Sequence, residues 1–518
     1  MRLHTYTIHQ EKQTARGQLQ VTFDEDYNLP AYKPDMSSII LKQGHVVIDE
    51  VKVSKGHVWV KGTLKFDVLY RAEQNSLGFC SSSGSAVFQE TIVLDGAEEF
   101  AIPTVRCVLE DLSVHITNSR KLAIRGLIQL EITLSEMQDI EVAADMEQED
   151  GLEVSKRNLS YLQLNVQGKD QCRVHEEMEL PGNKLNIQDL IWKDLRLEEV
   201  LIQPMSEGLQ LNGELSIFVL YQAEPGIRLE WYETRIPIQC RLEAPQMNGE
   251  GIVHVTRMDD DWNLVVQDDS EGESRMLVLD GVIRVEYRVY QEEQQTYMQD
   301  AYALDQTLIL GREKQVLEQL LMKNASRLKL TDSIVLNLGQ KEMLQVCHCA
   351  GDVQLNRWEV VPNGIQLEGT LTVGVLYLTQ EDASPIDAIT EQLPFQYRIE
   401  APRIGENCRY DLKETVHSLN VMMKTETLLE VQANLDFDLI VFEKVELDNI
   451  VDMNQEPLKL DALLSLPGLT GIRIKPGDTL WDIAKNNHTT IGAILENNQG
   501  VKEELEPGMV LLLLKQIK

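Results

Sequence analysis

One sequence pattern occurs three times along the chain, at nearly constant spacing. Residues 58–73 read VWVKGTLKFDVLYRAE, residues 209–224 read LQLNGELSIFVLYQAE, and residues 365–380 read IQLEGTLTVGVLYLTQ. The glycines of the three copies are Gly62, Gly213 and Gly369, and the tyrosines that follow them by eight residues are Tyr70, Tyr221 and Tyr377. The glycines are separated by 151 and 156 residues. A pattern that recurs at a fixed period indicates that one structural unit is built three times.

Two further blocks follow each copy, always in the same order. The second block is seen in residues 232–245 and 391–402, both of which end in Glu-Ala-Pro, and more weakly in residues 89–103. The third block comprises residues 122–132, 277–287 and 429–439. The repeat is therefore a whole domain with several elements.

The periodicity inside these blocks is two, which predicts β-strands with one buried face. Val58, Val60, Leu64 and Phe66 alternate with polar neighbours, as residues of a half-buried strand do. Glycine inside a strand suggests a bulge or a sharp bend. Because no long amphipathic helix separates the blocks, we expect three homologous, mainly β, antiparallel sandwich-like domains. Short helices are expected near residues 186–193 and 313–322, and the three repeated tyrosines are expected in the cores.

The composition of the chain disfavours several classes of partner and location. The chain has 48 basic and 83 acidic residues, a formal charge of −35, which disfavours nucleic acid and anionic lipid as main partners. No apolar run approaches the roughly 18–20 residues that cross a bilayer, and residues 1–20 lack the apolar core of a secretory signal. Seven scattered cysteines are an odd count that does not suggest a disulfide framework. We therefore expect an intracellular protein without a transmembrane segment.

The C-terminal segment, residues 472–518, differs from the repeats in carrying no net charge. Its order is strand, helix, helix, strand, with a buried last strand at residues 510–514. Thr479, followed three residues later by Asp482, and Thr490 are expected to cap the two helices. The expected boundaries are 1–150, 151–312 and 313–452 for the three domains, 453–470 for a linker and 471–518 for this module.

The module resembles the LysM family, through Ile-Lys-Pro-Gly-Asp-Thr-Leu-Trp-Asp-Ile-Ala and a later Leu-x-Pro-Gly-x-x-Leu. The resemblance implies a βααβ fold that binds N-acetylglucosamine polymers such as peptidoglycan. The binding residues it implies, for a glycan or a protein partner, are Gly477, Asp478, Thr479, Leu480, Trp481, Ile494, Asn497, Pro507 and Gly508. Two roles remain open for Trp481: a half-exposed anchor for a sugar or partner, or a core residue packed under the module's own sheet.

The repeats resemble the SPOCS domain, through the Gly…Val-Leu-Tyr strand and the block that ends in Ile-Glu-Ala-Pro. SPOCS domains occur in endospore-forming Firmicutes, often before a LysM module, and the second and third copies match better than the first. The whole arrangement resembles the SipL-type spore-coat morphogenesis proteins. That resemblance implies location in the mother-cell cytoplasm at the forespore outer surface, then in the coat, and binding of a coat ATPase of the stage IV sporulation protein A type.

The motifs that carry catalysis are not found. The sequence has no GxxxxGK[ST], GxSxG or GxGxxG pattern and no HExxH. Cys347-His348-Cys349 is expected to place two thiols on one face of a strand, with no second ligand pair nearby for zinc. The acidic run Asp259-Asp260-Asp261 is expected to be a solvated turn. We expect a non-enzymatic scaffold or adaptor without catalytic residues, metal or cofactor; the alternative is a peptidoglycan-binding protein of the cortex or wall.

Overall fold

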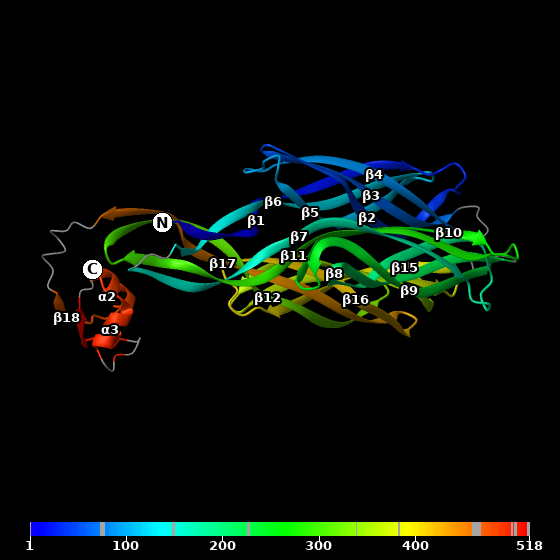
Figure 1. Ribbon diagram of the computed structural model, residues 1–518. Helices are drawn as coiled ribbons and strands as arrows, with labels where there is room; N and C mark the ends of the chain where they lie inside the picture. The colour runs from blue at the N-terminus through cyan, green and yellow to red at the C-terminus, as the bar shows by residue number, and fades with distance from the viewer. Residues whose placement is uncertain are drawn as a thin grey trace.

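The computed structural model describes residues 2–72, 78–147, 151–224, 228–337, 339–381, 384–457, 468–498, 501 and 505–514. Nearly all of them are in antiparallel strands, which form an elongated body with a small helical module at one end (Figure 1). The mainly β, antiparallel fold class is confirmed.

The first repeat consists of two three-stranded sheets. Their strands are β1 (Leu3–Asn28), β2 (Met36–Ser54), β3 (His57–Ala72), β4 (Phe79–Val93), β5 (Ile102–Asn118) and β6 (Lys121–Met146). The sheet orders are β1-β6-β5 and β2-β3-β4. Core residues from both sheets, such as Val60 on β3 and Ile132 on β6, belong to one apolar cluster, so the sheets pack face to face.

The second and third repeats follow the same plan. Their strands are β7 (Leu152–Glu179), β8 (Asn186–Glu224), β9 (Arg228–Asn248), β10 (Ile252–Asp268), β11 (Ser274–Ala303), and then β12 (Gln306–Val335), β13 (Met343–Val361), β14 (Gly364–Thr379), β15 (Ile386–Glu400), β16 (Cys408–Thr425) and β17 (Leu428–Pro457). The sheets are β10-β11-β7 with β8-β9, and β12-β17-β16 with β13-β14-β15. Strand β8 covers the positions of both β2 and β3. It folds back on itself, as the position of Gly213 against the backbone carbonyl of Glu198 shows.

The two short helices expected from the sequence are wrong. Residues 186–193 begin β8, and residues 313–322 lie inside β12. The apolar spacing of residues 313–322 suits a helix, but β12 pairs with β17 along its whole length, and Leu317 is fully buried among side chains of the other two repeats. Tertiary pairing has overridden the local pattern.

The repeated glycine is needed for space rather than for a special backbone angle. Neither Gly62 nor Gly369 has a positive φ, and in both cases an added Cβ would overlap the phenyl ring of the residue paired with it, Phe88 or Phe395. The expected bulge exists, but on the strand that pairs with the glycine strand on its other side, β2 or β13. The register shifts there between Ile48 and Glu50 and between Leu355 and Arg357, next to the residues that pair with Gly62 and Gly369.

This steric explanation predicts a stability effect. We expect Gly369→Ala to lower the free energy of unfolding by about 1–3 kcal/mol, since both the ring of Phe395 and the backbone carbonyl of Gln354 must move in a filled core. Gly374→Ala is the matched control on the same strand, because its Cβ would meet only the Ala350 carbonyl oxygen, at 3.9 Å. Urea unfolding followed by circular dichroism compares the two variants. Equal midpoints would contradict the explanation.

Val-Leu-Tyr divides its side chains between two cores. The tyrosines are fully buried inside their own sandwiches, as the sequence predicts, and their hydroxyls donate to the carbonyls of Pro34, Leu185 and Lys341 at 3.1–3.3 Å. The leucines Leu69, Leu220 and Leu376 point to the opposite face and are at most 1% exposed. They meet in one apolar cluster, the three-repeat junction: Leu69, Phe79, Ile191, Trp192, Phe218, Leu220, Cys347, Leu376 and Ile386.

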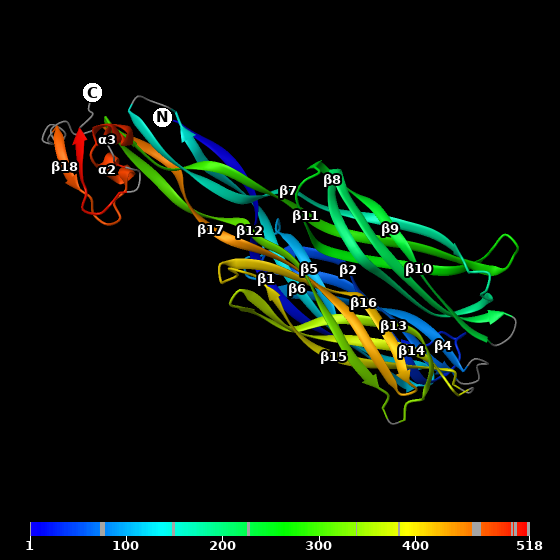
Figure 2. The same cartoon turned by 90° about the horizontal axis from the view of Figure 1, so that it is seen from below.

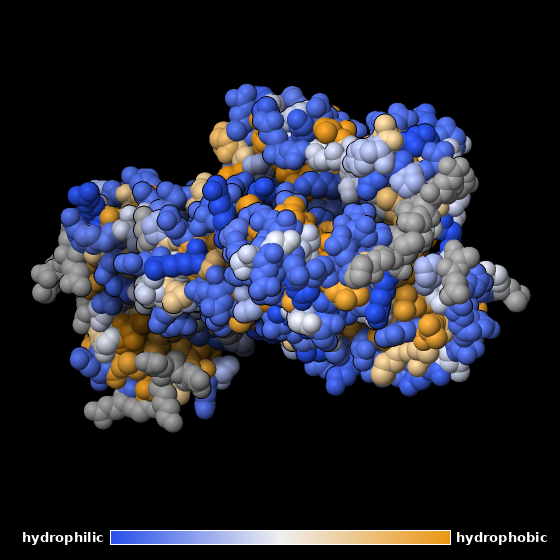
Figure 3. Space-filling model, turned by 90° about the vertical axis from the view of Figure 1, so that its right-hand side faces the viewer, coloured by the Kyte–Doolittle hydropathy of each residue, from blue (hydrophilic) through white to orange (hydrophobic). Residues whose placement is uncertain are grey.

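The longest strands form a second contact among the three repeats. The pairs β1–β6, β7–β11 and β12–β17 extend beyond the sandwiches as three ribbons that lie side by side and lead toward the helical module (Figures 1 and 2). Their shared core, the stalk, contains Ile8, Ile140, Val142, Leu159, Tyr161, Tyr297, Leu317 and Leu447. The three repeats are thus one body. Seen from the end opposite the module, the surface of the molecule is mostly polar, with several apolar areas, the broadest at the lower left (Figure 3).

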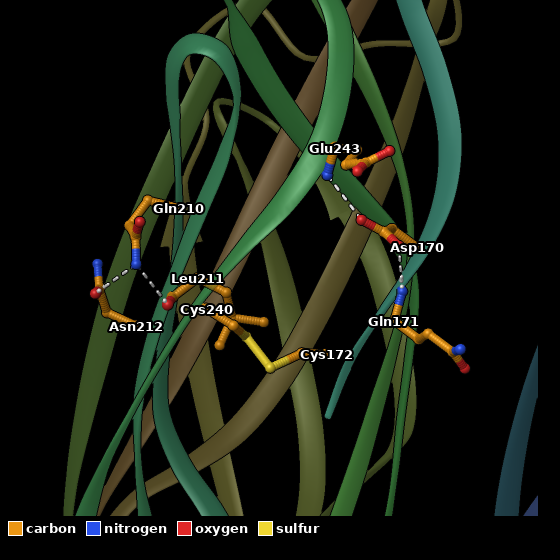
Figure 4. The surroundings of a disulfide bond; sticks show 8 residues. All are labelled: Asp170, Gln171, Cys172, Gln210, Leu211, Asn212, Cys240 and Glu243. Carbon is orange, nitrogen blue, oxygen red and sulfur yellow. Dashed lines mark hydrogen bonds between the residues drawn. A yellow bond between two sulfur atoms is a disulfide. The ribbon is translucent and has the colours of Figure 1, made fainter. Parts of the chain in front are cut away.

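Two of the seven cysteines are bonded, which the sequence did not indicate. Cys172 on β7 and Cys240 on β9 form a disulfide, with Cα atoms 6.1 Å apart (Figure 4). It joins the two sheets of the second repeat at their shared core, beside a hydrogen bond from the Glu243 amide to the Asp170 carboxylate. Cysteine spacing could not reveal this pair because the bonded residues are 68 positions apart.

Candidate functional site: a docked C-terminal module

The C-terminal module has the expected βααβ order. Its elements are β18 (Leu469–Arg473), α2 (Leu480–Asn486), α3 (Ile491–Asn497) and β19 (Val510–Leu514). Thr479 and Thr490 cap the helices as predicted, since their side chains accept hydrogen bonds from the amides of Asp482 and Ala493. Strand β17 continues to Pro457, so the first part of the expected linker is strand; residues 458–467 lie outside the described residues.

Two turns of the module lie next to each other. In the first, Gly477 has a φ of +93°, and the Asp478 carboxylate accepts the Lys475 amide at 2.8 Å. In the second, Gly508 has a φ of +96°. The Gly508 amide donates to the carbonyl of Ile474, which precedes the first turn. Glycine meets the positive φ that each turn requires.

The structure separates the predicted binding residues into three groups. Gly477, Thr479, Asn497, Pro507 and Gly508 are exposed, and Asp478 is half-buried beside them in sequence. Leu480 and Ile494 are buried in the module's core, so their side chains are not available to a ligand. The half-buried Trp481 lies elsewhere, against Tyr302 at the end of β11.

Trp481 is half-buried: it packs beside the module's own apolar core and also contacts the second repeat. Its indole N–H donates to the carboxylate of Asp300 on β11 at 2.8 Å. Its ring packs edge-on against Tyr302, with centroids 4.9 Å apart. Trp481 therefore anchors the module to its own chain, and Asp300 and Tyr302 complete a contact that sequence reasoning missed.

Asp300 is the centre of this contact. Its carboxylate accepts two hydrogen bonds from the Lys485 ammonium, at 2.7 and 2.9 Å, and one from Arg312 on β12 at 3.0 Å. Burial alone would raise the pKa of this carboxyl, but the hydrogen bonds from Lys485 and Trp481 outweigh it and lower the pKa below its usual value. Tyr302, only 4% exposed, donates its hydroxyl to the Thr489 carbonyl at 2.9 Å.

The outer face of the module's sheet is apolar. The expected buried strand at 510–514 is buried on one side only: Leu511 and Leu513 face the helices, whereas Val510, Leu512 and Leu514 are 40–63% exposed. Leu469, which pairs with Leu514, is 55% exposed. We call Leu469, Val510, Leu512 and Leu514 the outer sheet face. The period of two in Val-Leu-Leu-Leu-Leu was hidden because every residue is apolar.

The Cys347-His348-Cys349 segment forms contacts of another kind. The register of β13 shifts between Val346 and His348, so the thiols do not share a face: Cys347 packs in the three-repeat junction and Cys349 against the core of the third repeat. His348 Nε2 lies 2.9 Å from the Asp194 carboxylate. Burial raises the pKa of Cys347 to about 12, so the thiol stays protonated at neutral pH. Within the described ranges, no three or more His, Cys, Asp or Glu residues are grouped to hold a metal.

The acidic run Asp259-Asp260-Asp261 is part of β10 and not a solvated turn. Asp259 pairs with Arg257, and Asp261 pairs with Lys65 of the first repeat at 2.8 Å. These residues line a surface cavity of about 450 Å³ between the first and second repeats. Asp259 and Asp261 therefore each face a cation.

The comparisons with known proteins agree with this architecture. The family model of the SipL SPOCS domain matches residues 35–117 and 342–424, and that of the LysM domain matches residues 472–513. The SPOCS matches fall in the first and third repeats, so the expectation that the second repeat matches better than the first is wrong. The second repeat differs at the shared steric feature, since Ile238 pairs with Gly213 where the others have phenylalanine.

No curated protein and no solved structure matched the chain. Among the described residues, no helix is both long and apolar enough to span a membrane. SPOCS and LysM are both non-catalytic domain families. On its sequence pattern, its fold and the two family models, the chain has the SPOCS-plus-LysM architecture: two matched SipL SPOCS domains followed by a C-terminal LysM domain.

Proposed function

We propose that the chain is a non-enzymatic adaptor of spore-coat assembly. Its LysM module would bind a coat morphogenetic ATPase of the stage IV sporulation protein A type and help hold it at the forespore surface. The outer sheet face carries this proposal. Four large apolar side chains on a two-stranded sheet, each 40–63% exposed, suit burial against a protein.

The three repeats support a scaffold role in a specific way. Because the junction and the stalk join them into one body, they do not act as three independent tethers. The body places the LysM module at one end and the sandwich tips at the other (Figure 1). A rigid scaffold of this kind fixes the distance between whatever binds at its two ends.

Peptidoglycan is the second candidate ligand. The two adjacent turns support it: Gly477 and Thr479 in the first and Pro507 and Gly508 in the second are exposed residues, and backbone groups of exposed turns can hydrogen-bond to a sugar. These turns do not overlap with the outer sheet face, so variants separate the two functions.

We expect Leu512→Glu to weaken binding of the full chain to the ATPase at least about tenfold, because a charge would enter an apolar interface. Binding to insoluble peptidoglycan should not change. Pro507→Glu, at the exposed turn, is the matched variant and should have the reverse effect if the turns bind sugar. Pull-downs with each ligand, with circular dichroism to verify folding, measure both. Full ATPase binding by folded Leu512→Glu would reject the protein-docking proposal.

A further inference from the structure

The ends of the three ribbons are equivalent parts of the three repeats. The LysM module contacts the end of the second ribbon, so the three ends can be compared to find what is specific to that one. Each ribbon has one register shift near its end, beside His4, between Met298 and Asp300, and beside Arg312. In all three, an aspartate follows the extra residue: Asp145, Asp300 and Asp452. A bulge re-aims the side chains next to it, so each aspartate leaves the regular alternation of its strand at the same point.

Within the described ranges, the first and third of these aspartates form no hydrogen bond or ion pair with the LysM module. Asp145 pairs with Lys156 of the second repeat at 2.5 Å. Asp452 is exposed and accepts a hydrogen bond from Asn454. Asp300 has the pairing that corresponds to Asp145, with Arg312 of the next repeat, and in addition accepts from Trp481 and Lys485.

The residue two positions after the aspartate distinguishes the second ribbon. It is Tyr302 there, but Glu147 in the first ribbon and Asn454 in the third. Tyr302 and Leu304 pack in the same apolar cluster as Leu480, Ile483 and Leu511 of the module. Glu147 and Asn454 are exposed. Neither supplies an aromatic ring for Trp481 or apolar surface for the module's core.

We infer that the end of the second ribbon is a specific docking site for the LysM module, formed by Asp300 and Tyr302, and that Trp481 and Lys485 are docking residues and not ligand contacts. The docking site itself does not depend on the proposed function. Only the statement about which surface of the module a ligand reaches rests on it. With α2 seated on the ribbon, the turns around Gly477 and Gly508 and the outer sheet face remain exposed. The site therefore positions the binding surface relative to the body.

The indole proton of Trp481 reports on docking independently of any ligand. In the full chain labelled with ¹⁵N, its resonance is assigned by its loss in Trp481→Phe. We expect Asp300→Asn combined with Tyr302→Ala to speed exchange of this proton with solvent at least tenfold. Asp145→Asn is the matched control, because it removes the equivalent carboxylate of the first ribbon, and it should leave the rate within twofold. Tyr302→Phe, which keeps the ring, should give a smaller increase than the double variant.

Each outcome decides the inference. Unchanged exchange in the folded double variant, or equal acceleration in Asp145→Asn, would overturn it. If only the proposed function is wrong, the double variant still exchanges its Trp481 indole proton faster than the unmodified chain, but neither the ATPase nor peptidoglycan binds. Where a ligand does bind, Trp481→Phe should keep its affinity within twofold, and a loss of tenfold or more would show that Trp481 contacts the ligand.

Discussion

Replacing Leu220 with aspartate is expected to destabilise the whole body and not one repeat alone. Leu220 is fully buried in the three-repeat junction with Leu69 and Leu376, the equivalent leucines of the other two repeats. A carboxylate there would be desolvated beside apolar groups from all three repeats. We expect a loss of at least about 4 kcal/mol in the free energy of unfolding, the range that marks a buried, unpaired charge.

Leu201→Asp is the matched control for this change. Leu201 lies on the same strand, β8, but is 52% exposed, so the same substitution should cost no more than about 0.5 kcal/mol. Thermal unfolding followed by circular dichroism, with size-exclusion chromatography, compares the two variants. If Leu220→Asp unfolded at the temperature of Leu201→Asp, the three repeats would not share a core.

Asp194 should make stability depend on pH in the acid range. Its carboxylate, 3% exposed, accepts hydrogen bonds from Gln43 of the first repeat and Arg196 of its own, both at 3.0 Å, and lies 2.9 Å from His348 Nε2 of the third. Burial would raise the pKa of Asp194, but the charge of Arg196 and the hydrogen bond with His348 hold it well below the usual value.

The sign of the pH effect follows from that lowered pKa. A carboxyl whose folded pKa is depressed stabilises the protein above its unfolded pKa, about 3.9, and loses this contribution as the pH falls toward the folded value. Asp194→Asn should therefore cost about 3–5 kcal/mol at pH 7, since it leaves Arg196 and His348 without their shared partner. The difference from the unmodified chain should shrink below about pH 4.

The second partner of Arg196 provides the control. Asp352 pairs with Arg196 at 3.1 Å, but its side chain is 80% exposed, so Asp352→Asn should cost about 0–1 kcal/mol at pH 7. Urea midpoints measured from pH 3 to pH 8 test both variants. A constant difference between Asp194→Asn and the unmodified chain over that range would contradict a charge-based contribution.

Some features were readable from the sequence because they depend on local pattern. Alternation in residues 58–66 predicted a half-buried strand, and the repeated tyrosines were correctly placed in the cores. Thr479 and Thr490 were recognised as helix caps because a cap is formed by neighbours in sequence. Resemblance to LysM indicated the binding residues around the two turns, but it could not tell that Leu480 and Ile494 point inward or that Trp481 contacts another domain.

The sequence by itself determined that the chain builds one β-sandwich unit three times and ends in a βααβ module. Only the tertiary structure decided that the units share a core, because alternation shows that a face is buried but not what covers it. In Val-Leu-Tyr three apolar residues follow one another without alternation, a pattern typical of strands that are covered on both faces. The three junction leucines, Leu69, Leu220 and Leu376, lie more than a hundred positions apart, as do Asp300 and Trp481, and no local pattern encodes such a pairing.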